Sequence, residues 1–257
     1  MLSPRSVAPQ GGIKERIKPM NHKPIALWSV PRSLSTAFER VFFERGDFEV
    51  FHEPFSASYY YSTERRSDRF VDEEPKEEYR YEKVLAEILA PGERPIFFKD
   101  MAYHVTGLMS PEFVARFHYT FIVREPQYVP MSLYKMWPDF TFEEAGYEEL
   151  YRLFGYVIEE NQEPIVVDAF DLSENPEGVV AAYCEKLGMP FIPEALSWKP
   201  REVPEWKMWE DWHEDAQKST GINKINHEEL TLPEELEEVY RRCLPYYEAL
   251  YAERLRV

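Results

Sequence analysis

The chain has 257 residues, of which 44% are hydrophobic, and its formal net charge is −17. This length suits one large domain, and the apolar content, with 17 tyrosines and 17 phenylalanines, excludes a disordered chain. Acidic residues outnumber basic ones by 47 to 30, which argues against a protein that binds nucleic acid or another polyanion. A small anion can still bind, because a few cations in a pocket are enough.

The chain begins with a polar segment over residues 1–22 that is rich in proline and glycine. We expect it to be a flexible leader, followed by one domain over residues 23–257, because it lacks the apolar centre of a secretory signal. No apolar run approaches the roughly 20 residues that a membrane span needs. Cys184 and Cys243 have no metal-ligand spacing around them and are typical of reduced thiols, so we expect a cytoplasmic protein.

Apolar runs typical of buried strands alternate along the chain with helical patterns. The expected strands are Ile25–Val30, Phe48–Phe51, Pro95–Lys99, Tyr119–Val123 and Pro164–Phe170. The expected helices are Ser35–Arg45, Glu77–Leu89, Pro126–Met136, Phe142–Glu160 and Pro176–Leu187. We therefore predict a three-layer, P-loop-like α/β fold with about five mostly parallel strands, helices on both faces and ligands at the carboxyl ends of the strands.

The turn after the first expected strand carries the strongest chemical signal. It reads P-R-S-L-S-T and combines one cation with three hydroxyls at the start of a helix: Arg32, Ser33, Ser35 and Thr36. Hydroxyls and the free N–H groups of a helix N-terminus form a cradle for a phosphate-like anion. The Walker A pattern G-x-x-x-x-G-K-[ST] is absent, so we do not expect ATP to be bound in its usual way.

The ends of the second and third strands supply candidates for acid–base chemistry. The segment F-H-E-P-F gives His52 and Glu53, and K-D-M-A-Y-H gives Lys99, Asp100 and His104. A carboxylate or imidazole at a strand end can accept a proton from a substrate, and a lysine there can stabilise negative charge. Each of these residues can equally be an ion-pair or hydrogen-bond partner, and the sequence leaves both roles open.

A second cation site follows the fourth expected strand. Arg124 ends that strand, and Ser132 comes eight residues later, about two turns into a helix that we expect to begin at Pro126. An arginine with a nearby hydroxyl suits a terminal phosphate monoester. Together with the first loop, at the same edge of the sheet, this site would bind one ligand that has two separated phosphate groups.

Two regions break the alternation of strands and helices. Residues 62–80 are highly charged, which is typical of a solvated loop and also compatible with a mobile cover over the site. Trp206, Trp209 and Trp212 are three residues apart, a spacing that serves helix packing or an aromatic lid. We expect residues 198–257 to form a lid and a capping helix, the latter broken near Pro245.

The two loops resemble those of the sulfotransferases that use 3′-phosphoadenosine 5′-phosphosulfate (PAPS). That family has P-[KR]-S-G-[ST]-T after its first strand, similar to Pro31–Thr36, and I-V-R-[DE]-P…S-L-Y later, similar to Ile122–Tyr134. The resemblance covers roughly residues 24–190. It implies a PAPS-dependent sulfotransferase that sulfates a hydroxyl or amine of a small molecule and releases adenosine 3′,5′-bisphosphate.

The resemblance also implies roles for individual residues. The first loop would hold the 5′ end of the donor, and Arg124 with Ser132 would hold the 3′-phosphate. The expected cofactor-binding residues are Arg32, Ser33, Leu34, Ser35, Thr36, Ala37, Arg124, Ser132, Ser219, Thr220 and Gly221. The expected catalytic residues are Arg32 and Lys99, as cations, and Glu53, His52 and His104, as candidates for the general base.

The chain departs from the family pattern at several positions. Leu34 replaces the usual glycine, so we expect a loop backbone compatible with a Cβ atom. Ala37 stands where cytosolic members have an aromatic residue that stacks on adenine, and K-D-M at Lys99 replaces K-T-H, so the usual histidine base is missing. A glutamate in a similar E-P segment serves some bacterial members, which favours Glu53 as the base.

Two other functions remain open at this point. A nucleoside-kinase-like enzyme would use I-V-V-D, ending at Asp168, to hold Mg²⁺, and a non-catalytic nucleotide-binding protein would keep the fold without the reaction. The sulfotransferase interpretation needs no metal. The sequence leaves the acceptor and the oligomeric state undetermined, a homodimer being one option.

Overall fold

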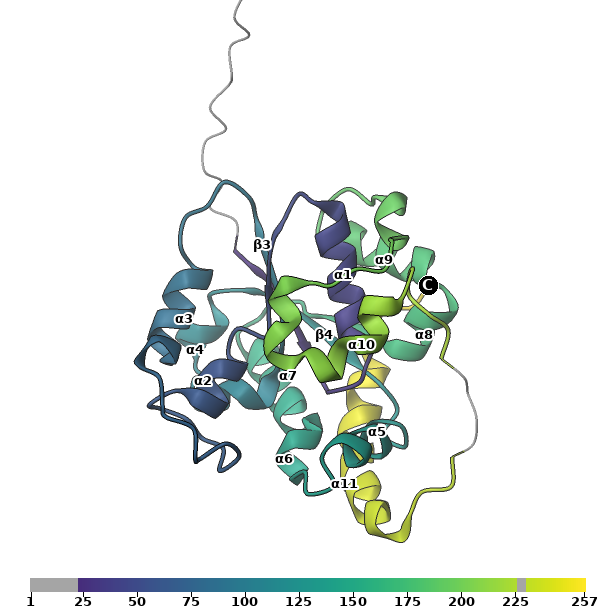
Figure 1. The fold of residues 1–257 in the computed structure, drawn as a ribbon. Helices are drawn as coiled ribbons and strands as arrows, with labels where there is room; N and C mark the ends of the chain where they lie inside the picture. Colours follow the sequence, from purple (N-terminus) through teal and green to yellow (C-terminus); the bar gives the residue numbers. More distant parts are fainter. Residues whose placement is uncertain (1–22, 226–229) are drawn as a thin grey trace, which may run out of the picture.

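The computed structural model describes residues 23–225 and 230–257, so the expected leader over residues 1–22 lies outside the described residues. One all-parallel sheet lies at the centre of the molecule, among the helices (Figure 1), and has the strand order β2-β3-β1-β4-β5. Its strands are β1 (Ile25–Ser29), β2 (Glu49–His52), β3 (Ile96–Met101), β4 (His118–Val123) and β5 (Ile165–Asp168). The predicted α/β fold with a parallel five-stranded sheet is confirmed.

Helices of very different length connect the strands. The α-helices are α1 (Ser35–Arg45), α2 (Ser56–Tyr61), α3 (Tyr81–Ile88), α4 (Pro111–Val114), α5 (Val129–Met136), α6 (Phe142–Ala145), α7 (Tyr147–Glu159), α8 (Ala169–Glu174), α9 (Pro176–Lys186), α10 (Glu210–Lys218) and α11 (Glu234–Ala252). The 3₁₀ helices are η1 (Glu77–Tyr79), η2 (Ala102–Val105), η3 (Pro193–Leu196) and η4 (Pro204–Trp209). Within the described ranges, none of these helices is both long and apolar enough to cross a lipid bilayer.

Both faces of the sheet are buried, and the alternation of side chains along β1 shows how. Ala26 and Trp28 point to one face, where they join the core formed with α3, α4, α7 and α11. Ile25 and Leu27 point to the other face, which α1, α8 and α9 cover. The strands β1 and β5 are buried along their whole length, whereas the edge strand β2 is half-buried.

The topology determines where a ligand can bind. β1 lies at the centre of the sheet, between β3 and β4. The chain leaves β1 toward β2 on one side and leaves β4 toward β5 on the other, so the two connections diverge and flank a crevice at the strand ends. The connection after β1 is the hydroxyl-rich loop, and the connection after β4 begins with Arg124.

The helix expected at Pro126 begins later than predicted. It starts at Val129 with Pro130 in its first turn, while Pro126 lies in the turn before it. Ser132 is therefore in the first turn of α5 and not two turns in. The sequence offered two prolines, and the second is the one that takes the N-terminal position, where its missing N–H has no helical partner to lose.

Other boundaries differ for local reasons. The helix predicted over 142–160 is divided at Gly146, whose φ of 81° a glycine adopts without strain. The strand predicted to reach Phe170 ends at Asp168, because the carboxylate of Asp168 caps α8. The helix predicted from Glu77 begins as η1 and is interrupted at Arg80 before α3.

The break expected at Pro245 does not occur, because α11 runs from Glu234 to Ala252 through this proline. Pro245 lies on the exposed side of the helix, where water can bind the carbonyl that has lost its helical N–H partner. Cys243 and Leu250 are buried on the packed side. α11 packs against α7, α5, β5 and β4.

Candidate active site

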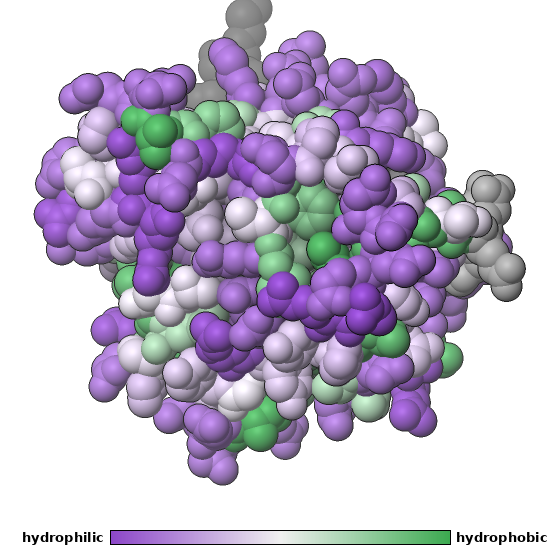
Figure 2. Space-filling model, turned by 90° about the horizontal axis from the view of Figure 1, so that it is seen from below, coloured by the Kyte–Doolittle hydropathy of each residue, from purple (hydrophilic) through white to green (hydrophobic). Residues whose placement is uncertain are grey.

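A cavity of about 280 Å³ opens at the carboxyl ends of the central strands. One end is polar and is formed by the loop after β1, Lys99, Arg124, Ser219, Gly221 and Asn223. The other end is aromatic. In Figure 2 the surrounding surface is largely hydrophilic, and apolar side chains show near the centre of this face.

Most of the predicted site residues meet in the cavity wall. Those that line it are Arg32, Ser33, Leu34, Ser35, Thr36, Ala37, Glu53, Lys99, His104, Arg124, Ser219 and Gly221. The other three do not line it. Ser132 lies beside the loop, where it contacts Arg32, and His52 lies behind the wall. Thr220 accepts a hydrogen bond from the backbone of Trp198 through its carbonyl.

The first loop has the backbone of an anion cradle. Arg32 and Leu34 have φ angles of 58° and 64°, in the left-handed region that favours glycine. The loop thus keeps a glycine-type conformation at Leu34, contrary to the expectation of a path suited to a Cβ atom, at a cost of about 1 kcal/mol. The N-terminus of α1 has no side-chain cap, so its N–H groups can bind an anion.

The two expected cation sites are in direct contact. Nη1 of Arg124 donates a hydrogen bond to the backbone carbonyl of Arg32 at 2.8 Å, and Nε of Arg32 donates to the hydroxyl of Ser132 at 2.9 Å. Burial lowers the pKa of both guanidinium groups below their ordinary value. Nε of Arg124 is buried without a partner among the described residues. Two buried guanidinium groups, one of them with an N–H that has no partner among the described residues, are suited to bind an anionic ligand.

Glu53 and Lys99 form a buried ion pair at the ends of β2 and β3. Glu53 has a φ of 43°, and its N–H donates to the carbonyl of Lys99 at 2.7 Å, which fixes the turn. Burial alone raises the pKa of Glu53, but the charge of Lys99 holds it well below its usual range. Such a carboxylate is a weak base, and its evident role is to balance Lys99.

His104 lies in a different environment, with one ring nitrogen bound and the other open. Its Nδ1 lies 2.6 Å from Oδ1 of Asp100, and this carboxylate also accepts hydrogen bonds from the backbone N–H groups of Phe55 and Met101. These contacts assign the proton to Nδ1 and a lone pair to Nε2. Nε2 is buried without a partner among the described residues. His104 can therefore accept a proton from a molecule in the cavity.

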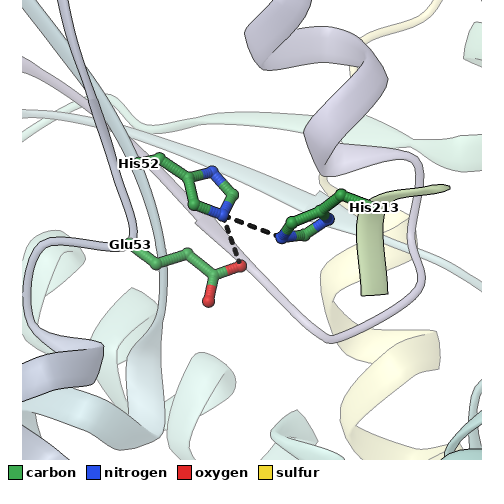
Figure 3. Close-up of side chains that lie close together, drawn as sticks. All are labelled: His52, Glu53 and His213. Carbon is green, nitrogen blue, oxygen red and sulfur yellow. Dashed lines mark hydrogen bonds and ion pairs between the residues drawn. The ribbon is translucent and has the colours of Figure 1, made fainter. Parts of the chain in front are cut away.

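Behind the loop, a chain of hydrogen bonds links α1, β2 and α10. Nε2 of His52 lies 2.9 Å from Nε2 of His213 (Figure 3), and Nδ1 of His52 lies 2.8 Å from the carboxylate of Glu39. The other ring nitrogen of His213 lies 3.4 Å from the hydroxyl of Thr36, in the first loop. His52 is thus a structural link, while His213 lines the cavity.

His52, Glu53 and His213 lie close enough together to hold a metal ion, with ligand atoms within 4.8 Å of one another. Lys99 donates to the Glu53 oxygen that faces His52, however, and an ammonium group repels a divalent cation. The cluster is better described as a hydrogen-bonded network.

The other end of the cavity is lined by aromatic and apolar side chains from several segments. They are Tyr60, Met101, Tyr103, Leu133, Trp137, Trp209 and Trp212. Glu144 is buried in this wall and pairs with Arg69, whose guanidinium lies 4.1 Å from the ring centre of Trp137. The wall suits a small molecule with an apolar body.

Several of these residues escaped the sequence analysis. His213 follows Trp212, and the regular spacing of the tryptophans indicates helix packing or an aromatic lid but gives no sign of a role for the neighbouring histidine. Glu144 stands three residues after Thr141 in a capping box, which predicts a helix start and not a cavity wall. Nothing in the sequence distinguishes Glu39 from an ordinary acidic residue on a helix. A bond to a residue more than 150 positions away leaves no signal in a single sequence.

Asp168, the residue on which a kinase interpretation depends, does not line the cavity. Oδ1 accepts hydrogen bonds from the N–H groups of Phe170 and Asp171, and Oδ2 accepts one from the hydroxyl of Tyr247. The carboxylate is used as a helix cap and has no open side toward a nucleotide.

Comparisons with known proteins place the chain in a family. Two Arabidopsis thaliana proteins named branched-chain-amino-acid aminotransferase-like protein 2 and 1 are 32% and 30% identical over 232 and 230 residues. These matches cover 88% and 87% of this chain but 41% and 40% of the plant proteins, so the chain spans about two fifths of their length.

A solved structure gives the same fold. The sulfotransferase domain from the Synechococcus PCC 7002 olefin synthase matches with a TM-score of 0.55 at 17% identity, covering 93% of this chain and 99% of that domain. The sequence profile described as Sulfotransferase domain matches residues 23–254. The chain therefore belongs to the sulfotransferase family.

Proposed function

We propose that the protein transfers a sulfuryl group from PAPS to a hydroxyl or amine of a small molecule. The observation that carries this proposal is the meeting of Arg32 and Arg124 at one crevice, where a nucleotide with charged groups at its 5′ and 3′ positions can contact both. When bound, PAPS supplies the sulfuryl group: the acceptor atom bonds to sulfur, the bond from sulfur to the 5′-phosphate breaks, and adenosine 3′,5′-bisphosphate leaves.

The residues of the polar end would hold this donor. The hydroxyls and N–H groups of residues 33–36 suit the 5′ end, and Arg124, with its unpartnered Nε, suits the 3′-phosphate. Ser132 supports the same site by accepting the hydrogen bond from Arg32. Ser219 and Gly221 border the cavity next to the loop and would contact the nucleotide from the other side.

Cations in the wall would stabilise the transition state, in which negative charge lies on the transferred group and the leaving phosphate. Lys99 and Arg32 face this position from two strand ends. The buried ion pair with Glu53 holds the ammonium group of Lys99 in position.

The proton of the acceptor would go to Nε2 of His104. Asp100 holds the opposite nitrogen and stabilises the imidazolium ion that forms, as a carboxylate does beside a catalytic histidine. We propose His104 over Glu53 and His52 for this role, because Glu53 is committed to Lys99 and His52 does not line the cavity. The aromatic end would hold the acceptor, with residues 206–216 closing over it within a single domain of residues 23–257.

Ligand-dependent thermal unfolding tests the proposal. Adenosine 3′,5′-bisphosphate should raise the melting temperature well above the effect of ATP with Mg²⁺. At a ligand concentration of 100 times Kd, the expected stabilisation is about 2.7 kcal/mol. Equal or greater stabilisation by ATP would favour the kinase interpretation, and binding without turnover on a panel of alcohols and amines would favour a binding protein.

A further inference from the structure

His213 is a buried side chain in the cavity wall to which the proposed reaction gives no role. It is 6% exposed, lies on α10 and faces the first loop through Nδ1, 3.4 Å from the hydroxyl of Thr36. The same stretch of chain contacts the loop a second time, because Nη1 of Arg32 donates to the carbonyl of Trp212 at 2.8 Å. Two residues of the anion cradle are thus held by adjacent residues of α10.

The hydrogen bonds behind His213 determine where its protons lie. The carboxylate of Glu39 accepts hydrogen bonds, so Nδ1 of His52 donates to it, and in a neutral His52 ring Nε2 carries the lone pair. Nε2 of His213 must then donate to Nε2 of His52, at 2.9 Å. Consequently Nδ1 of His213 carries a lone pair that accepts from the hydroxyl of Thr36. The next proton taken up by His213 goes on Nδ1, the atom that faces the loop.

The charges around His213 make this proton unfavourable until an anion arrives. Arg32 faces it from the first loop and Lys99 from β3, while His52 and Glu53 face it from the end of β2. Burial, and then the charges of Lys99 and Arg32, lower the pKa of His213 well below its ordinary value, against the opposing effect of Glu53. A phosphate group beside Arg32 and Lys99 would cancel their repulsion and attract a proton to the imidazole.

We propose that His213 binds the 5′ anionic end of the nucleotide as an imidazolium ion and takes up a proton at Nδ1 when the nucleotide binds. This inference rests on the proposed function, because it requires the loop to hold the donor. Glu39 and His52 act as positioning residues that fix the tautomer and stabilise the charged ring. α10 thereby contributes a positive charge to the donor site, and this charge forms only when the nucleotide binds.

Calorimetry measures the proton directly. Adenosine 3′,5′-bisphosphate is titrated near pH 7 into the wild type and into His213→Gln, each in two buffers with different enthalpies of ionisation. The wild type should take up more protons for each nucleotide bound than the variant, by an amount on the order of one. Since the phosphates of the ligand titrate near pH 6, the difference between the two proteins is the quantity that counts.

His118→Gln is the matched control, because it removes an exposed imidazole at the start of β4, at the opposite end of the strands. Its proton uptake should equal that of the wild type. Equal uptake by the wild type and His213→Gln, with binding intact, would overturn the role of His213 and leave the proposed function standing. Absence of nucleotide binding by the wild type would overturn both.

A second measurement avoids any substitution in the site. In protein labelled with ¹⁵N at its histidines, saturation with adenosine 3′,5′-bisphosphate should move the two ring-nitrogen signals of His213 to imidazolium positions. The signals of a neutral ring in the saturated protein would contradict the proposal.

Discussion

His104 lines the cavity, with one ring nitrogen bound to Asp100 and the other buried without a partner among the described residues. His104→Gln keeps a polar side chain of similar reach but has no lone pair suited to accept a proton at neutral pH. We expect kcat to fall by roughly 10²- to 10⁴-fold, while the affinity for adenosine 3′,5′-bisphosphate stays unchanged. Steady-state assays with nucleotide titrations separate the two effects. A kcat close to that of the wild type would exclude His104 as the base.

The ion pair of Glu53 predicts that folding stability depends on pH, because the pKa of Glu53 in the folded protein lies far below the ordinary value of 4.5. The unfolded chain binds a proton near pH 4.5 and the folded one does not, so the pair with Lys99 contributes stability above that pH and loses it as the pH falls. Glu53→Gln leaves Lys99 buried without its counter-ion and should cost about 3 kcal/mol at pH 7.

Urea unfolding of both proteins at a series of pH values checks this. The difference in unfolding free energy should be constant from pH 7 to about pH 5 and should narrow below pH 4.5. A difference that does not depend on pH would mean that the carboxylate of Glu53 is not held ionised by Lys99.

Leu34 provides a third test, because leucine occupies a left-handed position with a φ of 64°. Leu34→Ala and Leu34→Gly lose nearly the same packing, but only glycine relieves the backbone strain. The glycine variant should therefore unfold at the higher denaturant concentration, with an advantage of about 1 kcal/mol over alanine. An alanine variant at least as stable as the glycine variant would show that the loop carries no such strain.

Gly146, between α6 and α7, shows how one break between elements shapes the site. Its φ of 81° turns the chain, and a Cβ atom built there would lie 3.3 Å from Cδ of Pro31, at the start of the donor loop. Gly146→Ala should lower the stability by about 1–2 kcal/mol and weaken nucleotide binding, because either α7 or the loop must move. Thermal unfolding with and without adenosine 3′,5′-bisphosphate measures both effects.

Gly155 is the matched control within α7, since a Cβ atom there meets nothing within 4 Å. Gly155→Ala should stabilise the protein by up to about 1 kcal/mol through helix propensity and leave nucleotide affinity unchanged. If the two alanine variants behave alike, the position of Gly146 against the loop has no special importance.

At the scale of the whole molecule, local sequence signals predict the strands and the helices α1 and α9 well. Apolar runs identify all five strands to within two residues at each end, and Ser35–Arg45 is found with its observed bounds. The pairing of Arg32 with Arg124 follows from sheet topology, which an alternating pattern already implies. The contact between Thr36 and His213 depends instead on how α10, far along the chain, packs against the first loop. No periodic pattern in the sequence predicts that contact.

The same topology leads to a last prediction, because β1 and β4 are neighbouring strands and one nucleotide would bridge the loops that follow them. The wild type should bind adenosine 3′,5′-bisphosphate more tightly than AMP, since only the former reaches Arg124 with a 3′-phosphate. Arg124→Ala should abolish this difference, which we expect to be roughly tenfold to hundredfold for charged hydrogen bonds. Arg116→Ala removes an exposed arginine on the segment before β4 and should retain the difference. Calorimetric affinities for both nucleotides give the ratio, and a ratio that survives in Arg124→Ala would place the 3′-phosphate elsewhere.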